Sequence, residues 1–283
     1  MRKILVVMAD IHSGDNQGLM PPDVQLLDDT GPEPRVWTPA QTAIQREWLW
    51  PNYVRDMGSV FDLAGKSEVT LALPGDLTQG NKYHDGLVSS RMADQFTIAL
   101  ANLEPWYAHK NLKNVYLVQG TGAHEFGEGS APVVLSEVLA KRYPKVRTAY
   151  HRHYLLDVDG ALVDIAHHGP APSKRAWLKE NMLRYYTKSL MFDEIIAGRA
   201  VPAAIVRAHV HEPIKPQRVW VGDYKCEAVV VPCYCGITTY VMQVARSPYI
   251  LHCGLVALEF VDGALREVYP FWRSVDLRQR EAV

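Results

Sequence analysis

Short apolar runs alternate with amphipathic stretches through the first half of the chain. Residues 3–9 are a continuous apolar run rich in Ile, Leu and Val, which is typical of a buried central strand. Similar runs predict strands at residues 68–73 and 115–119. Helical spacing of apolar residues predicts helices over residues 39–63, 85–104 and 131–142. This alternation predicts an α/β sheet with a functional site at the carboxyl ends of its strands.

The segment between the first two strands departs from this alternation. Residues 13–40 are rich in Gly, Pro, Asp and Gln without periodicity, and a loop of that length is usually functional or disordered. The helix that follows contains Pro51, which we expect to kink or divide it. Residues of about 13–64 therefore form an inserted loop-helix segment in one domain, 1–283.

The second half of the chain is mostly β. Asp159-Gly160 and Asp262-Gly263 are strong signals for hairpin turns. A long helical pattern covers residues 173–196. The sequence predicts β structure over residues 154–158, 161–166, 203–206, 218–231, 238–244, 251–261 and 265–269.

Composition limits the classes of function. The chain has 283 residues, of which 48% are hydrophobic, so it can bury one large core. The formal net charge of −1 excludes a global basic field of the kind that drives non-specific nucleic-acid binding, although it leaves room for a local basic groove. No apolar stretch approaches the roughly 20 residues needed to cross a bilayer, and the first apolar run is too short for a signal peptide. We therefore expect a soluble, cytoplasmic protein without a membrane partner.

The four cysteines lie in apolar, strand-like contexts. This setting favours reduced core cysteines over a disulfide framework. Cys233-Tyr234-Cys235 is a weaker alternative as half of a zinc site, because its spacing lacks the two intervening residues and the partner pair of the usual structural sites.

Metal-type ligands recur where apolar runs end. Asp76 follows a strand and is framed by Gly75 and Gly80, and alone it could simply cap a turn. Four further groups change that interpretation, because each also follows an apolar run. They are Asp10-Ile11-His12, His124-Glu125, His167-His168 and His209-Val210-His211.

Taken in order, these motifs resemble those of the calcineurin-like metallophosphoesterase superfamily. The matching stretches are Asp10-Ile11-His12, Gly75-Asp76, Gly122-Ala123-His124-Glu125, His167-His168-Gly169 and Ala208-His209-Val210-His211. Five motifs in the right order are far more specific than any one of them. The resemblance covers residues 4–211, and it implies a four-layer α/β sandwich of two mixed β-sheets flanked by helices.

The resemblance also implies a site for two divalent transition-metal ions. Asp10, His12 and His211 would hold one ion, His209 and the His167/His168 pair would hold the other, and Asp76 would bridge both. We expect Asp10 and His12, and likewise His209 and His211, to point the same way as residues i and i+2 of an extended strand end. Imidazole and carboxylate ligands suit Mn, Fe, Zn, Co or Ni better than Ca, but they do not choose among these metals. Of these ions we expect manganese.

Some ligand assignments stay open. Adjacent residues on a strand face opposite ways, so we expect one of His167 and His168 to be a ligand and the other a neighbour, with His168 slightly preferred. The family has an asparagine ligand where this chain has Ala123, which cannot bind a metal. The second ion is therefore bound more weakly, or water or a neighbouring group such as Thr121 replaces the asparagine. Ala208, in place of the usual glycine, adds only a methyl group.

The implied reaction is metal-dependent hydrolysis of a phosphoester. His124 would lie outside the metal shell and protonate the leaving oxygen or stabilise its charge, because histidine exchanges a proton near neutral pH. Glu125 would either orient His124 or cap the next element. A phosphodiesterase or nuclease fits better than a protein phosphatase, with a nucleotide or nucleic acid as the phosphoester partner.

A different class of function remains, because Ala123 weakens the motif. The chain could be a non-catalytic interaction scaffold of the same fold with a degenerate second metal site, as in a retromer subunit.

Asn81, His84 and Arg175 are candidates for substrate contacts, with solvated loops and a charged helix face as the alternative explanations.

Overall fold

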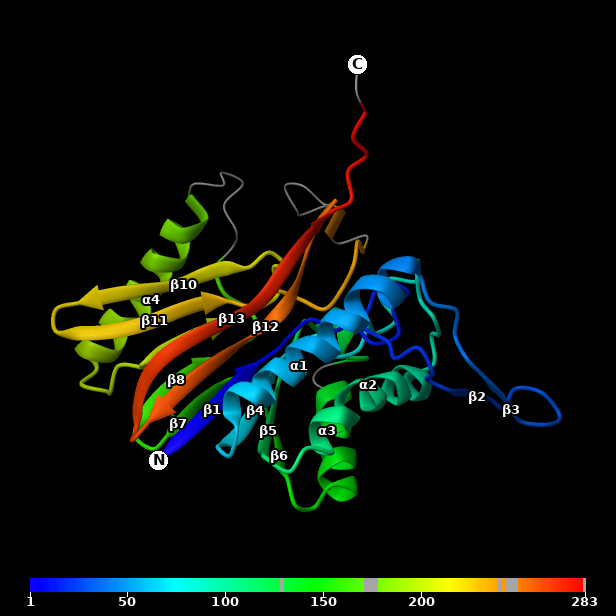
Figure 1. The fold of residues 1–283 in the computed structure, drawn as a ribbon, viewed down its shortest axis with the longest axis horizontal. Helices are drawn as coiled ribbons and strands as arrows, with labels where there is room; N and C mark the ends of the chain where they lie inside the picture. Colours follow the sequence, from blue (N-terminus) through cyan, green and yellow to red (C-terminus); the bar gives the residue numbers. More distant parts are fainter. Residues whose placement is uncertain (128–129, 171–177, 239–240, 243–248, 282–283) are drawn as a thin grey trace.

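The computed structural model describes residues 1–127, 130–170, 178–238, 241–242 and 249–281. Within these residues the chain forms an α/β structure with two mixed β-sheets and a small hairpin (Figure 1). The α/β class and the mixed sheets confirm the prediction from the sequence.

The larger sheet has six strands, and the first strand of the chain lies near its centre. β1 pairs parallel with β4, which is followed by β5 and β6 in parallel, whereas β12 and β13 complete the other side in antiparallel pairing. In spatial order the strands are β13 (Ala264–Asp276), β12 (Ile250–Val261), β1 (Arg2–Val7), β4 (Glu68–Pro74), β5 (Leu112–Val118) and β6 (Arg147–His151).

The smaller sheet has five strands. β9 pairs parallel with β8 and β11, and antiparallel strands flank these three. In spatial order they are β10 (Ile214–Val221), β11 (Tyr224–Val230), β9 (Ala204–Arg207), β8 (Ala161–Ile165) and β7 (Tyr154–Val158). A separate hairpin joins β2 (Leu26–Asp28) to β3 (Arg35–Trp37).

Alternate side chains of β1 enter two different cores. Ile4 and Val6 pack in one apolar cluster with residues of the helices, whereas Leu5 and Val7 pack in another cluster with residues of the smaller sheet. This follows from the period of two along a strand. All four side chains are buried, which explains why the run is apolar throughout rather than alternating.

The helices cover the outer sides of the sheets. Figure 1 shows α1, α2 and α3 beside the six-stranded sheet and α4 beside β10 and β11. Each helix buries one apolar side, through Tyr53, Leu103, Leu135 and Leu183 respectively. The bounds are α1 (Trp50–Ala64), α2 (Met92–Tyr107), α3 (Ser130–Arg142) and α4 (Lys179–Ile196), with a π-helical turn η1 (Gln45–Leu49) and a 3₁₀ turn η2 (Gly122–His124).

Pro51 divides the first helical segment, as expected. It lies in the first turn of α1, directly after the π-helical turn η1. Proline lacks an N–H group and its ring crowds the preceding turn, so the wider π turn accommodates it there.

Three sequence expectations on element position were incomplete. The loop 13–40 contains the three-residue strands β2 and β3. Strand β6 was not predicted, because it is an edge strand without a buried residue and so lacks an apolar run. The helix expected over 85–104 begins at Met92. Residues 218–231 are mostly β, as predicted, and form a hairpin of β10 and β11.

Two predictions fall partly outside the described residues. The helix 173–196 is described from residue 178, and α4 begins at Lys179. Of the strand expected over 238–244, residues 239–240 and 243–244 lie outside the described part. Val241 and Met242 are helical instead, because the Met242 N–H donates to the Thr238 carbonyl oxygen at 3.0 Å. In the described part of the chain, no helix is both long and apolar enough to cross a membrane.

Candidate metal centre

Every predicted metal ligand follows the carboxyl end of a parallel strand. Asp10 follows β1, Asp76 follows β4, and His209 follows β9. Main-chain hydrogen bonds join the loops, since the Asp10 N–H donates to the Gly75 carbonyl and the His12 N–H to the Asp76 carbonyl. The two sheets meet here as well, because the His209 N–H donates to Asp10 Oδ2 at 3.1 Å. The fold therefore brings motifs far apart in the sequence to one edge.

One donor group consists of Asp10, His12 and His211. Their ligand atoms lie within 4.8 Å of one another, and all three residues are buried. His12 Nε2 is 3.1 Å from His211 Nε2, and His211 Nε2 is 3.5 Å from Asp10 Oδ1. Gln79 Oε1 is 2.8 Å from His12 Nδ1 and, as an acceptor, holds the proton there, which turns the Nε2 lone pair toward the group. Sequence reasoning missed this role of Gln79.

The backbone at these ligands is not extended. Asp10, His12, Asp76, His209 and His211 all have positive φ, between 45° and 75°. The expectation that i and i+2 share a strand face is therefore wrong at Asp10 and His12, since β1 ends at Val7 and both residues adopt left-handed turns. Such backbone is uncommon for non-glycine residues and clusters at functional sites.

The second donor group consists of His167, His168 and His209. The three rings offer nitrogens within 4.8 Å of one another, and His167 Nε2 is 3.1 Å from His209 Nδ1. The argument that His167 and His168 must point apart fails, because β8 ends at Ile165 and strand alternation stops there. His167 is buried, with Nδ1 2.8 Å from the Pro74 carbonyl oxygen, whereas His168 is exposed.

His209 and His211 divide between the two groups. Each has positive φ, and Val210 lies between them in a bend after the end of β9. The extended-strand expectation is wrong here too, yet the division between groups is the one that the family resemblance implies.

Asp76 links the two donor groups. It forms a third group with Asp10 and His167, and its Oδ2 is 3.1 Å from His167 Nε2. Gly120 passes directly behind it, since a Cβ atom at position 120 would lie 2.3 Å from Asp76 Oδ1. The Thr121 N–H donates to the same oxygen at 2.7 Å. The glycine therefore lets the backbone reach and orient the carboxylate.

His124 lies beside the donor groups. Its Nδ1 is 2.7 Å from the Gln79 carbonyl oxygen, and its Nε2 is 4.0 Å from Asp76 Oδ2. Thr78 Oγ1 donates to the His124 carbonyl at 2.6 Å. Among the described residues, His124 belongs to none of the three groups that could hold a metal.

Glu125 was expected either to orient His124 or to cap the next element. Its buried side chain accepts a hydrogen bond from the Gly120 N–H, and its carbonyl accepts one from the Ala131 N–H at 3.2 Å. Glu125 thus holds the glycine loop and the start of α3, while Gln79 contacts the His124 ring.

The charges differ sharply between neighbouring histidines. Burial, together with His124 and His211, lowers the pKa of His12 to about 3. Burial and the charge of His167 lower the pKa of His209 to about 4. Burial also disfavours the charge on His167, but the Asp76 and Asp10 carboxylates outweigh it and raise that pKa to about 9. In the metal-free protein His12 and His209 are therefore neutral at pH 7, whereas His167 is an imidazolium cation with a proton on both ring nitrogens.

This proton must leave when a cation takes its place. We expect Mn²⁺ binding at pH 7 to release protons and its affinity to rise by about tenfold per pH unit for each proton released, until the pH passes about 9 at His167. The sign follows from competition, since His167 is protonated below its raised pKa. Calorimetry in two buffers of different protonation enthalpy measures the number of protons. Identical heats in both buffers would contradict the expectation.

The predicted substrate residues lie at the surface. Asn81 and His84 are exposed in the loop before α2, and Arg175 lies outside the described residues. From the same loop Tyr83 reaches the site, with its ring centroid 5.9 Å from that of His124.

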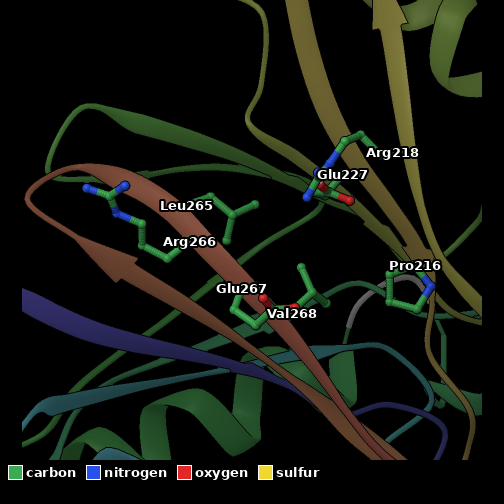
Figure 2. A pocket seen from close by; sticks show the side chains of 7 residues that line it. All are labelled: Pro216, Arg218, Glu227, Leu265, Arg266, Glu267 and Val268. Carbon is green, nitrogen blue, oxygen red and sulfur yellow. The ribbon is translucent and has the colours of Figure 1, made fainter.

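Two surface cavities differ in their relation to the site. One, of about 510 Å³, is lined by His167 and His168 together with Gly120 and the exposed Arg152. The other, of about 250 Å³, lies between β10, β11 and β13, and Figure 2 shows the Arg218–Glu227 ion pair at its wall. None of the candidate ligands is among the residues described as lining this second cavity.

The cysteines are separate from the donor groups. All four are buried and free, as expected for reduced core cysteines. In the described part of the chain, no cysteine belongs to a group of residues that could hold a metal. The Cys233-Tyr234-Cys235 zinc alternative therefore has no support.

The donor set fits divalent transition metals. It combines imidazole nitrogens with two buried carboxylates, which suit Mn, Fe, Zn, Co and Ni. Burial opposes ionisation of Asp76, but His167, His124 and His12 hold its pKa well below the usual value, so it is an anion at neutral pH. Among the described residues, Asp10 Oδ1 is buried without a hydrogen bond of ordinary length, and its neighbour is His211 Nε2 at 3.5 Å, so a metal ion could take the place of the His211 proton there. Comparison of the sequence with protein-family models and with curated proteins gives no match.

Proposed function

We propose that the chain is a metal-dependent phosphoester hydrolase of the calcineurin-like metallophosphoesterase superfamily. One observation carries the proposal, namely three overlapping donor groups in which Asp10 and Asp76 join the histidines of two neighbouring sites. A single metal would not need overlapping groups. Two cations that share a carboxylate would use all of them, and they would bind where the motifs of the family converge.

The arrangement of the chain supports the same proposal. In the proposed four-layer sandwich, α1 to α3 form one outer layer, the two mixed sheets form the centre, and α4 forms the other outer layer. The donor groups would then lie at one edge of the central sheets, as the resemblance implies.

Different residues of the chain would have different roles in the hydrolysis. When bound, the two ions would activate water for in-line attack and offset the charge of the phosphoryl oxygens. Gln79 orients both His12, through its side chain, and His124, through its carbonyl. With Nδ1–H donated to the Gln79 carbonyl, His124 directs Nε2 toward the site, and in its imidazolium form it would supply the Nε2 proton to the leaving oxygen.

The adjoining cavity supports a phosphodiester substrate. Its volume of about 510 Å³ falls in the range typical of small-ligand sites, and it begins at His167 and His168. The exposed Arg152 at its wall offers a cation for an additional phosphate or for the backbone of a nucleotide or nucleic acid.

A substrate panel tests the proposal. Metal-free protein is reloaded with Mn, Ni, Zn or Mg and assayed on a phosphomonoester, a phosphodiester, a cyclic nucleotide, and single- and double-stranded DNA. We expect hydrolysis of a phosphodiester, with Mn²⁺ most active. Binding of metal without hydrolysis of any substrate would instead support the non-catalytic scaffold.

A further inference from the structure

The second donor group lacks the oxygen ligand that the family resemblance places at position 123. Ala123 offers only a methyl group, but the neighbouring Thr121 supplies an oxygen at the site. Its Oγ1 is 3.2 Å from His167 Nε2 and 3.3 Å from His209 Nδ1. These two nitrogens are 3.1 Å apart, so the three atoms form a nearly equilateral triangle.

The size of this triangle fits one coordination shell. Ligand atoms at about 2.1 Å from a metal are separated by about 3.0 Å at adjacent octahedral positions and by about 3.4 Å in a tetrahedron. All three separations lie between these limits. Asp76 Oδ2, at 3.1 Å from His167 Nε2, adds a fourth donor at the same spacing.

The lone pairs of the three atoms also suit a shared cation. In neutral His167 the proton is held on Nδ1 by the Pro74 carbonyl, so Nε2 presents a lone pair. A cation that displaces the proton of His167 would be faced by lone pairs from all three atoms of the triangle.

The main chain fixes the position of the hydroxyl. The Thr121 N–H donates to Asp76 Oδ1 at 2.7 Å, and the residue has ordinary extended angles just before η2. Gly120 allows this close approach, as described above. The hydroxyl therefore comes from a backbone position that is already tied to the candidate bridging carboxylate.

We propose that Thr121 Oγ1 is the oxygen ligand of the second cation site, in place of the amide that position 123 lacks. The assignment rests on the two-cation site of the proposed function. A neutral hydroxyl resembles water as a donor, so it favours Mn²⁺ among the candidate ions and gives a weaker second site than the all-imidazole and carboxylate set of the first.

Calorimetric titration of metal-free protein with Mn²⁺ alone tests this assignment. Thr121→Val keeps the shape of the side chain and the N–H bond to Asp76 but removes the oxygen. We expect it to weaken the second binding event by at least roughly tenfold, since even partners outside the ligand set contribute that much. The first event should stay within about twofold, which also shows that the variant is folded.

Two further variants make the result specific. Thr121→Ser retains the hydroxyl and should bind the second ion nearly as wild type does. Thr148→Val removes another half-buried hydroxyl, on β6, and should leave both events unchanged. Unchanged binding of both ions by Thr121→Val, or equal losses in the Val and Ser variants, would overturn the assignment.

Hydrolysis is measured separately, so the two proposals can fail independently. If Thr121→Val loses the second ion but wild type hydrolyses no phosphoester, the ligand assignment stands and the hydrolase proposal falls. If wild type hydrolyses a phosphodiester while Thr121→Val keeps both ions, the hydrolase proposal stands and the ligand assignment falls.

Discussion

Asp76→Asn is expected to lose metal and activity together. The carboxylate is buried between the two donor groups, and its Oδ2 is 3.1 Å from His167 Nε2. Asparagine keeps the shape and an oxygen that can accept the Thr121 N–H bond, but it removes the negative charge. Two bound cations, at the separation of about 3.5–4 Å usual for two-metal sites, would then repel each other without a shared anion.

The expected effect is large. Charge stabilisation by metal ions amounts to several kcal/mol, and each 1.4 kcal/mol is tenfold, so hydrolysis should fall by about 10²-fold or more. Bound metal, measured by elemental analysis after dialysis, should fall below two ions per chain. Full activity with unchanged metal content would refute the bridging role of Asp76 and the two-metal site with it.

A matched control separates loss of charge from loss of fold. Asp56 is also fully buried, and it accepts hydrogen bonds from Tyr234 at 2.7 Å and Arg273 at 2.5 Å. Asp56→Asn should lower the stability of the protein, because Arg273 then lacks its anionic partner, but metal content should remain near that of wild type.

The convergence of the motifs was predictable because of strand direction. β1, β4 and β5 lie side by side and parallel, so the residues after them meet at one edge. A run of apolar residues followed by Asp or His is visible in the sequence, and so the candidate ligands could be named in advance.

The backbone at those ligands was not predictable. Asp10 and His12 were expected in an extended strand end, yet both adopt left-handed turns. Their conformation depends on hydrogen bonds to the Gly75 and Asp76 carbonyls, which lie in the loop after β4, more than 60 residues away in the chain. A local pattern contains no information on such contacts.

The late start of α2 has a similar cause. The Gln95 side chain accepts from the Gly80 N–H at 2.9 Å and donates to the Ser89 carbonyl at 3.0 Å. These bonds hold residues 80–89 as a loop against the site, although their sequence was assigned in part to a helix. Tertiary contacts here outweigh helix propensity.

His124→Ala is expected to slow turnover and leave the metals in place. His124 is buried, and Gln79 and Thr78 hold its ring and main chain. Its Nε2 is 4.0 Å from Asp76 Oδ2, close enough to face a phosphoryl group bound at the donor groups. General acid catalysis usually contributes about 10²–10⁴-fold, and the loss should fall in that range.

The leaving group distinguishes proton transfer from a structural effect. A nitrophenolate departs without protonation, so its diester should lose less activity in His124→Ala than a diester with an alcohol leaving group. His109→Ala, which removes a histidine stacked on Phe61 away from the donor groups, should affect neither substrate. If His124→Ala slows good and poor leaving groups equally while metal content is unchanged, His124 is not the general acid. Its contribution would then be to bind or orient the phosphoryl group, because that contribution does not depend on how readily the leaving oxygen departs.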